Sequence, residues 1–596
     1  MESQHHTPVD LGQTYPDLTG KPLSINSQDI LSHNPDRYKQ HGFHFKADNC
    51  IGCHACETAC AEKNGTPAHL SYRHVGYIEG GTYPDFVRVN VSMACNHCED
   101  PVCLKGCPTL AYTKYVEYGA VLQDPNICFG CGYCTWVCPY NAPVLDPVKG
   151  EVQKCNMCVD RLEDGLQPAC VSACLSNALD FGVIDSLPQG KQQAKLDIPG
   201  FPDPNMTRPN IRFEQTRSLP AQLTRADNDP FTYERDKSGS VQGVRNGRYQ
   251  MKPIESTKGM GWGLNKLHSR ENSLVHFTLL YQMVLGVFLL LFCSLLSPNV
   301  NPIRSLIAAY PTTLKGTLFA LIGLQFLGMF SSTMHLGKPQ FFYRAINNLR
   351  HSWVSREIFT TGAFFGLLAG YTGMMAFPSL IAWLSPFDAL LVETCGWGAA
   401  VVGPIGLYCM YRCYRIPARP FWNHWHTGGA FAASGLILGS LAIGLIFGVT
   451  AIWGRGSASA LLSFLSWPLL IGLLLQGISL LVHMDYLDRN GKEAAVSRML
   501  ILNRFGKTHI ARYISLVILM VGSVLFAAQW MTGIWGVLLW GIFFLQAIFH
   551  EVVGRAIFYV AVVPTTIPGA FFWGNKSFEE HARKSGLAQR PQVGVE

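Results

Sequence analysis

Sixteen of the 20 cysteines lie in the first third of the chain, in four groups of four. Cysteine thiolates bind soft metals and iron–sulfur clusters, so cysteines at short, repeated spacings are candidate metal ligands. The groups are Cys50, Cys53, Cys56 and Cys60; Cys95, Cys98, Cys103 and Cys107; Cys128, Cys131, Cys134 and Cys138; and Cys155, Cys158, Cys170 and Cys174. The remaining four cysteines lie beyond residue 290 and lack ligand spacing.

The spacing within the groups points to iron–sulfur cubanes. The first and third groups follow the pattern C-x2-C-x2-C-x3-C, whereas the second and fourth widen the middle gap. In such a run, three close thiolates bind one [4Fe–4S] cluster and the fourth reaches a different cluster. Zinc sites and disulfides are the alternatives, but two complete runs do not suit tetrahedral zinc, and a disulfide framework is typical of secreted chains. Sixteen thiolates therefore predict four [4Fe–4S] clusters, with none left over.

The rest of the chain is dominated by long apolar runs. Charged residues are only 15% of the 596 residues, and they concentrate before about residue 270. Runs of about 17 to 23 apolar residues are long enough to cross a bilayer as helices. We predict eight spans, at about 273–297, 316–336, 357–383, 389–411, 426–453, 459–483, 511–530 and 534–563. The net charge of +7 is too weak and too scattered to indicate nucleic-acid binding.

The expected fold class is an α+β ferredoxin-like poly-[4Fe–4S] domain followed by an all-α eight-helix transmembrane bundle. A linker between them is rich in Pro, Asn, Arg, Asp and Gln and has no sustained apolar period. We expect it to be extended, with some ordered packing because of its length; a belt that docks a partner or caps the membrane domain is the alternative. The predicted segments are a polar extension (1–45), the cluster domain (46–187), the linker (188–270), the membrane anchor (271–565) and a cytoplasmic tail (566–596).

The basic loops predict which side of the membrane the cluster domain faces. Eight spans put both ends of the bundle on one side, together with the loops after spans two, four and six. These loops and flanks carry nineteen Lys and Arg residues, against three on the opposite side. Because positively charged loops stay in the cytoplasm, we expect the cluster domain on the cytoplasmic face of a bacterial inner membrane. The first 45 residues lack the pattern of an export signal, which agrees with this expectation.

Ionisable side chains in or beside the spans gather on the same side, where they are functional candidates. Histidine and carboxylate exchange protons near neutral pH, as quinone redox chemistry requires. The ionisable candidates for a quinone site are His276, His335, Arg356, Glu357, His424, His426, His483, His550, Glu551 and Arg555, and Gly337 is a further candidate beside His335. Two alternatives remain: ordinary histidines at helix ends, or a haem held by two facing histidines. We expect no haem, because the other half of the membrane offers no histidine for a second one.

The cysteine-rich part resembles a known family. The strings SMACNHCEDP at 92–101 and ALDFG at 178–182 are similar to the four-cluster iron–sulfur subunits of molybdopterin oxidoreductases, especially the dimethyl sulfoxide reductase type. The resemblance covers about 45–187 and implies crossed ligation, in which the last cysteine of one group binds the cluster of another. The implied ligand sets are Cys50, Cys53, Cys56 and Cys174; Cys155, Cys158, Cys170 and Cys60; Cys95, Cys98, Cys103 and Cys138; and Cys128, Cys131, Cys134 and Cys107. Leu175 stands where these proteins often have proline.

The membrane part resembles the anchor subunit of the same family. The similar strings are MHLGKP at 334–339, SWVSREI at 352–358, WNHWHT at 422–427 and EVVGRA at 551–556. This resemblance spans nearly all of 272–563 and implies eight helices, no haem and quinol binding. It also implies that the quinol-site histidine and glutamate of the family correspond to His335 and Glu357.

Both resemblances imply a subunit that carries electrons between quinone and a separate catalytic subunit with a molybdenum or tungsten bis-pterin. Membrane lipid and quinone are the other expected partners. Cytoplasm-facing relatives include quinone-linked sulfite dehydrogenases, so we expect sulfite oxidation with electrons entering the quinone pool. The alternatives are reduction of dimethyl sulfoxide or another S- or N-oxide by quinol, a formate dehydrogenase or hydrogenase relay, and a polysulfide-type system.

Overall fold

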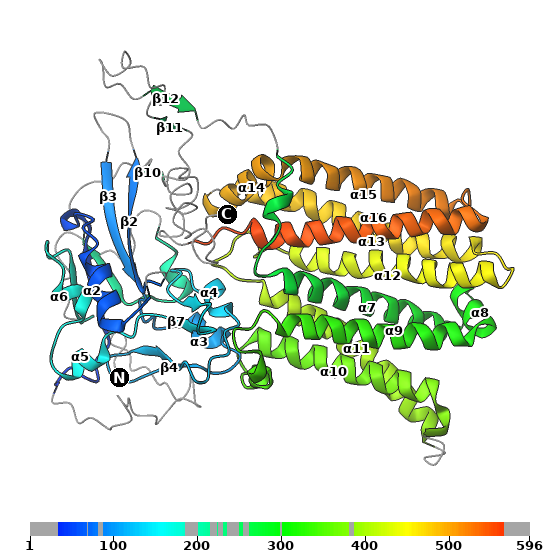
Figure 1. The fold of residues 1–596 in the computed structure, drawn as a ribbon, viewed down its shortest axis with the longest axis horizontal. Helices are drawn as coiled ribbons and strands as arrows, with labels where there is room; N and C mark the ends of the chain where they lie inside the picture. Colours follow the sequence, from blue (N-terminus) through cyan, green and yellow to red (C-terminus); the bar gives the residue numbers. More distant parts are fainter. Residues whose placement is uncertain are drawn as a thin grey trace. The chain divides into compact units, whose positions relative to one another are not determined.

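The computed structural model describes eleven stretches of the chain, which form two compact units: the cysteine-rich part and the long helices. The described residues are 34–67, 70–80, 87–184, 201–214, 223–224, 231–234, 250–253, 261–298, 301–380, 387–490 and 492–565. The predicted fold class is confirmed, because small sheets and short helices make up the first unit and long apolar helices the second (Figure 1). Each unit is described by itself below.

A three-stranded sheet joins the beginning of the cysteine-rich unit to segments that follow its last cysteine group. Its central strand β1 (His41–Lys46) pairs antiparallel with β8 (Leu179–Val183) and parallel with β9 (Ile211–Glu214). The strand that precedes the first cysteine group therefore pairs with the one that follows the last group. Both β1 and β9 extend the unit beyond the segment 46–187 expected from sequence. Short strands paired over such sequence distances leave little periodic signal to detect.

Hairpins and short helices hold the cysteines between these strands. The antiparallel pairs among the cysteines are β2 (Arg73–Gly80) with β3 (Val87–Ala94), β4 (Tyr112–Lys114) with β5 (Val121–Gln123), and β6 (Val144–Asp146) with β7 (Glu151–Gln153). Beyond β9, β11 (Phe231–Glu234) pairs with β12 (Gln250–Pro253). Strand β10 (Leu223–Thr224) adds to β2. The helices are α2 (Ala55–Asn64), α3 (Val102–Gly106), α4 (Tyr133–Val137), α5 (Val159–Glu163) and α6 (Ala169–Ser172).

Among its described residues, the second unit has eight helices long and apolar enough to cross a membrane, as predicted. They are α7 (Asn272–Leu296), α9 (Pro311–Thr333), α10 (Trp353–Ala376), α11 (Asp388–Cys413), α12 (His426–Trp453), α13 (Ser459–Arg489), α15 (Gly506–Ala527) and α16 (Gly533–Val560). Shorter helices α8 (Pro302–Ala309) and α14 (Lys492–Arg504) lie between them. Several of these helices begin or end a turn or more away from the predicted spans, because helical hydrogen bonding is not limited to apolar residues. Glu357 and His483 therefore lie within helices, and His335 lies just beyond α9.

Helices α7 and α12 form the centre of this unit. Helix α12 packs against α7, α13 and α16, and α10 pairs with α11 (Figure 1). Glycines allow the close crossing of α7 and α12: a Cβ added to Gly286 would lie 2.0 Å from the carbonyl oxygen of Gly435. Small residues at helix crossings are typical of membrane bundles. Apolar side chains such as Phe359, Ile518 and Leu545 are exposed on the outer helices, as expected for a surface covered by lipid.

Candidate functional site

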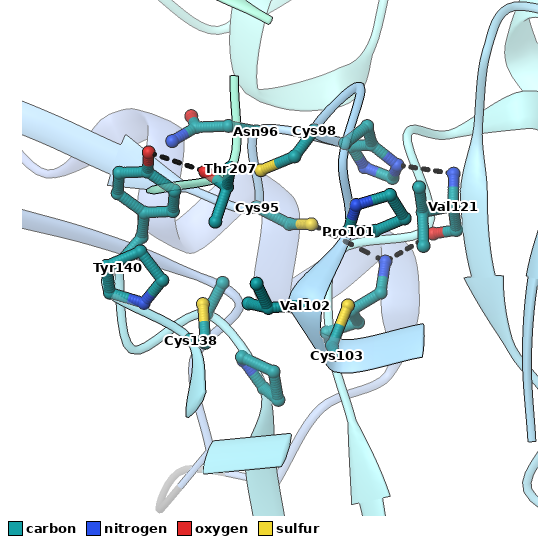
Figure 2. Close-up of a pocket in the computed structure, with 15 residues that line it drawn as sticks. Cys95, Asn96, Cys98, Pro101, Val102, Cys103, Val121, Cys138, Tyr140 and Thr207 are labelled. Carbon is teal, nitrogen blue, oxygen red and sulfur yellow. Dashed lines mark hydrogen bonds between the residues drawn. The ribbon is translucent and has the colours of Figure 1, made fainter. Parts of the chain in front are cut away.

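One cavity in the cysteine-rich unit is surrounded by four cysteines. Cys95 and Cys98 follow strand β3, Cys103 lies in α3, and Cys138 ends α4. Figure 2 shows their four sulfur atoms around one space, whose other walls include Pro101, Val102 and Tyr140. Cys138 thus lies with the second cysteine group, although it is the last member of the third.

Buried lysines place positive charge beside this cavity. Lys154 donates to Sγ of Cys95 at 3.5 Å and to the carbonyl oxygen of Cys155 at 3.0 Å. Burial lowers the pKa of Lys154, but the Cys95 and Cys103 thiolates outweigh burial, so that its pKa is raised. Burial lowers the pKa of Lys114 to about 8, and its ammonium donates to the carbonyl oxygen of Cys98 at 2.7 Å. A group of thiolates around an iron–sulfur cluster carries net negative charge, which these ammonium groups offset.

Backbone turns and polar contacts fix the walls of the cavity. His97 has a left-handed backbone, with φ of 42°, and its Nδ1 accepts a hydrogen bond from the Val121 backbone at 3.0 Å. The hydroxyls of Tyr140 and Thr207 lie 2.8 Å apart (Figure 2). Thr207 comes from the stretch assigned to the linker, so part of that stretch belongs to the wall of this site.

Cysteines of different groups also interact electrostatically elsewhere in this unit. Burial raises the pKa of Cys107, and the charge of Cys128, in the third group, acts on it. In the same way Cys174 acts on Cys50. Burial raises the pKa of Cys60 to about 12, with Cys170 and Cys158 contributing. The assignment of each fourth cysteine to a cluster stays a prediction, because similar interactions also join Cys56 with Cys170 and Cys155 with Cys95.

These thiols suit iron–sulfur clusters better than the alternatives. None of the cysteines, all of which fall in described stretches, is in a disulfide. No group of three or more His, Cys, Asp or Glu side chains within the described stretches could hold a metal ion such as zinc. A cubane spreads its thiolate ligands over four irons, so they lie further apart than the ligands of one ion. Burial raises the pKa of many of these thiols, so a bound metal would have to stabilise their thiolate form.

A third buried cation, Arg73, interacts with cysteines of the first and fourth groups. Arg73 is 1% exposed, and it donates to the hydroxyl of Ser92, which lies 3.3 Å from Sγ of Cys56. Its guanidinium interacts electrostatically with Cys170, Cys56, Cys155 and Cys60. Neither Arg73 nor Lys154 was a candidate from sequence. The signal that could have found Lys154 is its place directly before Cys155.

In the membrane unit, His335 and Glu357 have separate partners. His335 follows α9, where its Nδ1 contacts the carbonyl oxygen of Ser332 and its own carbonyl accepts from Arg270 at 3.0 Å. Glu357 is 9% exposed in α10, and the thiol of Cys413 donates to its Oε2 at 3.2 Å. Arg356 lies over the ring of Trp353 and donates to the carbonyls of the loop before α10. His276 and Gly337 are exposed.

Four of the other candidates line one buried cavity. His426, His483, Glu551 and Arg555 share it with Gln476, His509 and Arg512, among apolar residues that include Phe421, Phe431 and Phe558. His550 lies beside it, with Nε2 3.3 Å from the Gln476 amide, and His424 stacks on His483. Gln476, His509 and Arg512 were not predicted. Arg512 falls at the edge of an apolar run, where a charge resembles an ordinary flanking residue.

Comparison with known proteins identifies both units. Residues 87–184 match the 4Fe-4S dicluster domain, and residues 264–560 match the DMSO reductase anchor subunit (DmsC). One chain of the anaerobic dimethyl sulfoxide reductase of Haemophilus influenzae is 37% identical over 182 residues, which are 88% of that protein and 29% of this one. This protein is a member of the dimethyl sulfoxide reductase family. It is a fusion of the iron–sulfur component and the membrane anchor of this family, as the resemblances implied.

Other members of this family and its neighbours match the same region. The chain of the same name in Escherichia coli K12 is 39% identical over 180 residues, which are 87% of that protein and 29% of this one. One subunit of the sulfite dehydrogenase of Allochromatium vinosum is 39% identical over 154 residues, 64% of that protein and 22% of this one. The fusion is therefore a multi-pass membrane protein with [4Fe–4S] clusters that transfers electrons.

Proposed function

We propose that this chain connects a separate molybdopterin catalytic subunit to the quinone pool through four [4Fe–4S] clusters. The observation that carries this proposal is the set of sixteen cysteines, in which Cys138 shares a cavity with Cys95, Cys98 and Cys103. When bound, the clusters supply one-electron carriers. The protein holds them between apolar walls and offsets their charge with Lys154 and Arg73.

Crossed ligation is proposed for all four clusters, in the sets given by the family resemblance. Its test is the EPR spectrum of the reduced full chain after single substitutions. Cys138→Ser should remove the same signal as Cys95→Ser and leave the signal that Cys128→Ser removes. Cys409→Ser is the matched control, since this buried cysteine of α11 lies outside the ligand sets, and it should leave every signal intact. If Cys138→Ser instead removes the signal that Cys128→Ser removes, the crossed pairing is refuted.

Quinone exchange is proposed for the end of the bundle that holds His335 and Glu357. Glu357 is buried beside Cys413, and an ionisable carboxyl in this environment suits proton exchange with a quinone oxygen. His276, Gly337 and Arg356 remain peripheral candidates. The test is the rate at which the reduced chain is reoxidised by menadione: Glu357→Gln should slow it, and an unchanged rate would refute the role of Glu357.

For the complete complex we propose sulfite oxidation with electrons passing to quinone. The support is the similarity to the sulfite dehydrogenase of Allochromatium vinosum and the basic loops, which favour a cluster domain on the cytoplasmic face of the inner membrane. Reduction of dimethyl sulfoxide or another S- or N-oxide is the second candidate, supported by the dimethyl sulfoxide reductase relatives. The purified complex should reduce menadione with sulfite. If it instead oxidises menadiol with dimethyl sulfoxide and shows no activity with sulfite, reduction of dimethyl sulfoxide becomes the first candidate. A green fluorescent protein fused after Glu596 tests the orientation, since it should fluoresce on the cytoplasmic side.

A further inference from the structure

Two arginines lie over one tryptophan where α10 begins and α11 ends. Trp353 is the first residue of α10, and the guanidinium carbons of Arg356 and Arg412 lie 4.3 and 4.4 Å from the centroid of its ring. Arg356 is one turn further along α10, whereas Arg412 is the second-to-last residue of α11. An aromatic face attracts a guanidinium but has no net charge, so the ring holds two positive charges close together without neutralising them.

A third arginine continues this arrangement beyond the end of α11. Arg412 donates to the hydroxyl of Tyr408 at 3.0 Å. Arg415, three residues further on, donates to the hydroxyl of Tyr411 at 2.9 Å. The centroids of the two tyrosine rings lie 6.2 Å apart, and Tyr408 meets Trp353 edge-on at 6.1 Å, so the aromatic rings fix the positions of the guanidiniums. We call these three side chains the arginine cluster: Arg356, Arg412 and Arg415.

The arginine cluster has no acidic partner in the part of the chain that the structure describes, since none of its members forms an ion pair there. Arg356 donates to two backbone carbonyls, and Arg412 and Arg415 donate to tyrosine hydroxyls, so all these partners are uncharged. Within the described stretches, Nη1 of Arg356 and Nη2 of Arg412 make no hydrogen bond. Three positive charges with donors left over favour an anionic ligand, and the planar guanidinium suits a phosphate group.

An exposed apolar face of α11 leads to the arginine cluster. Side chains on this face recur at intervals of three or four residues and end in the cluster: Trp397, Val401, Ile405, Tyr408 and Arg412. Each of the first four is between 46% and 55% exposed. In a membrane, acyl chains cover such a surface, and phospholipid headgroups lie where the span ends, which is the level of the cluster. The face therefore offers an apolar surface for a lipid tail beside positive charge for a headgroup.

We propose that the arginine cluster binds the phosphate of an anionic phospholipid, whose acyl chain lies along the exposed face of α11. The headgroup of phosphatidylethanolamine adds an ammonium, which the three arginines repel, whereas phosphatidylglycerol and cardiolipin add no positive charge. Inorganic phosphate matches the charges but leaves the apolar face uncovered. The site requires only the membrane bundle, so it does not depend on the proposed quinone exchange.

Native mass spectrometry of the full chain, with clusters loaded and bound lipid removed, tests this site. The chain is mixed with phosphatidylglycerol or phosphatidylethanolamine at increasing concentrations, and the fraction that carries one lipid gives each dissociation constant. Phosphatidylglycerol should bind about tenfold more tightly than phosphatidylethanolamine. Arg412→Gln should weaken the binding of phosphatidylglycerol by about tenfold or more, because a hydrogen bond between charged groups contributes about that factor.

The matched control is Lys507→Gln, which removes an exposed positive charge at the start of α15, in one of the basic loops. A charge that acts only through the surface potential contributes about fivefold at most, so this variant should keep most of its affinity. Equal weakening by Lys507→Gln and Arg412→Gln would overturn the site, because the charges would then act without a defined position. Equal affinity of the parent chain for the two lipids would also overturn it.

Two further results distinguish other occupants of the arginine cluster. Ile405→Ser changes an exposed side chain of the apolar face and should weaken the binding of phosphatidylglycerol. Unchanged binding by this variant, or displacement of the lipid by an equal concentration of inorganic phosphate, would overturn the lipid site in favour of free phosphate. If Arg412→Gln leaves lipid binding unchanged but weakens binding of the separate catalytic subunit, the cluster docks a protein, and the lipid site is overturned.

Discussion

The buried ammonium of Lys154 should set the reduction potential of the clusters beside it. Lys154 is 6% exposed, lies 3.5 Å from Sγ of Cys95, and interacts electrostatically with Cys95, Cys103 and Cys155. Reduction adds a negative charge to a cluster, and a nearby positive charge stabilises that reduced state. Lys154→Met removes the charge and should therefore lower the potential.

The size of this shift follows from Coulomb's law. At about 6 Å from the centre of the cluster and an effective dielectric constant of about 20, the lost interaction is about 3 kcal/mol. For a one-electron couple, about 59 mV corresponds to a tenfold change or about 1.4 kcal/mol, so the expected shift is about 120 mV downward. Redox titration of the full chain followed by EPR measures it directly.

Two further variants separate charge from structure. Lys154→Arg keeps the positive charge and should keep the potential close to that of the parent. Lys149→Met removes an exposed lysine five residues away, whose charge is screened by water, and should change the potentials little. A shift in Lys154→Met no larger than that in Lys149→Met would refute the reasoning, because burial would then give Lys154 no special influence.

Other perturbations test the bundle and the clusters. Gly286→Ala should lower the melting temperature of the chain in detergent, since its Cβ would overlap the carbonyl of Gly435; a cost of about 1–3 kcal/mol is typical of overpacking. The exposed Gly323 of α9 has no atom within 4 Å of an added Cβ, so Gly323→Ala should leave the melting temperature unchanged or slightly higher. Removal of iron with a chelator should make the cysteine-rich unit more sensitive to protease than the helices, because the proposed clusters join segments as distant as Cys50 and Cys174. Equal sensitivity of both units before and after chelation would contradict that expectation.

The sequence alone determined the chemistry of the cysteines and the number of spans. Three ligands of each proposed cluster lie within a short stretch, and a local spacing such as that of Cys128, Cys131 and Cys134 is visible without a fold. Hydropathy likewise marks all eight spans, because a lipid-facing helix must be apolar along about 20 residues. The basic loops predict that the cluster domain faces the cytoplasm, and this orientation remains a prediction.

Only the tertiary structure decided which distant groups meet. It brought Cys138 to the second cysteine group, Lys154 to the sulfur of Cys95, and Arg512 to the cavity with Glu551. Local patterns carry no record of such contacts, since their residues lie on different elements and far apart in the chain. It also showed that His426 and His483 line one cavity, whereas His335 is not among the residues that line it. A polar residue inside an apolar run looks the same from sequence whether it faces a neighbouring helix, a water or a ligand, and packing alone distinguishes these cases.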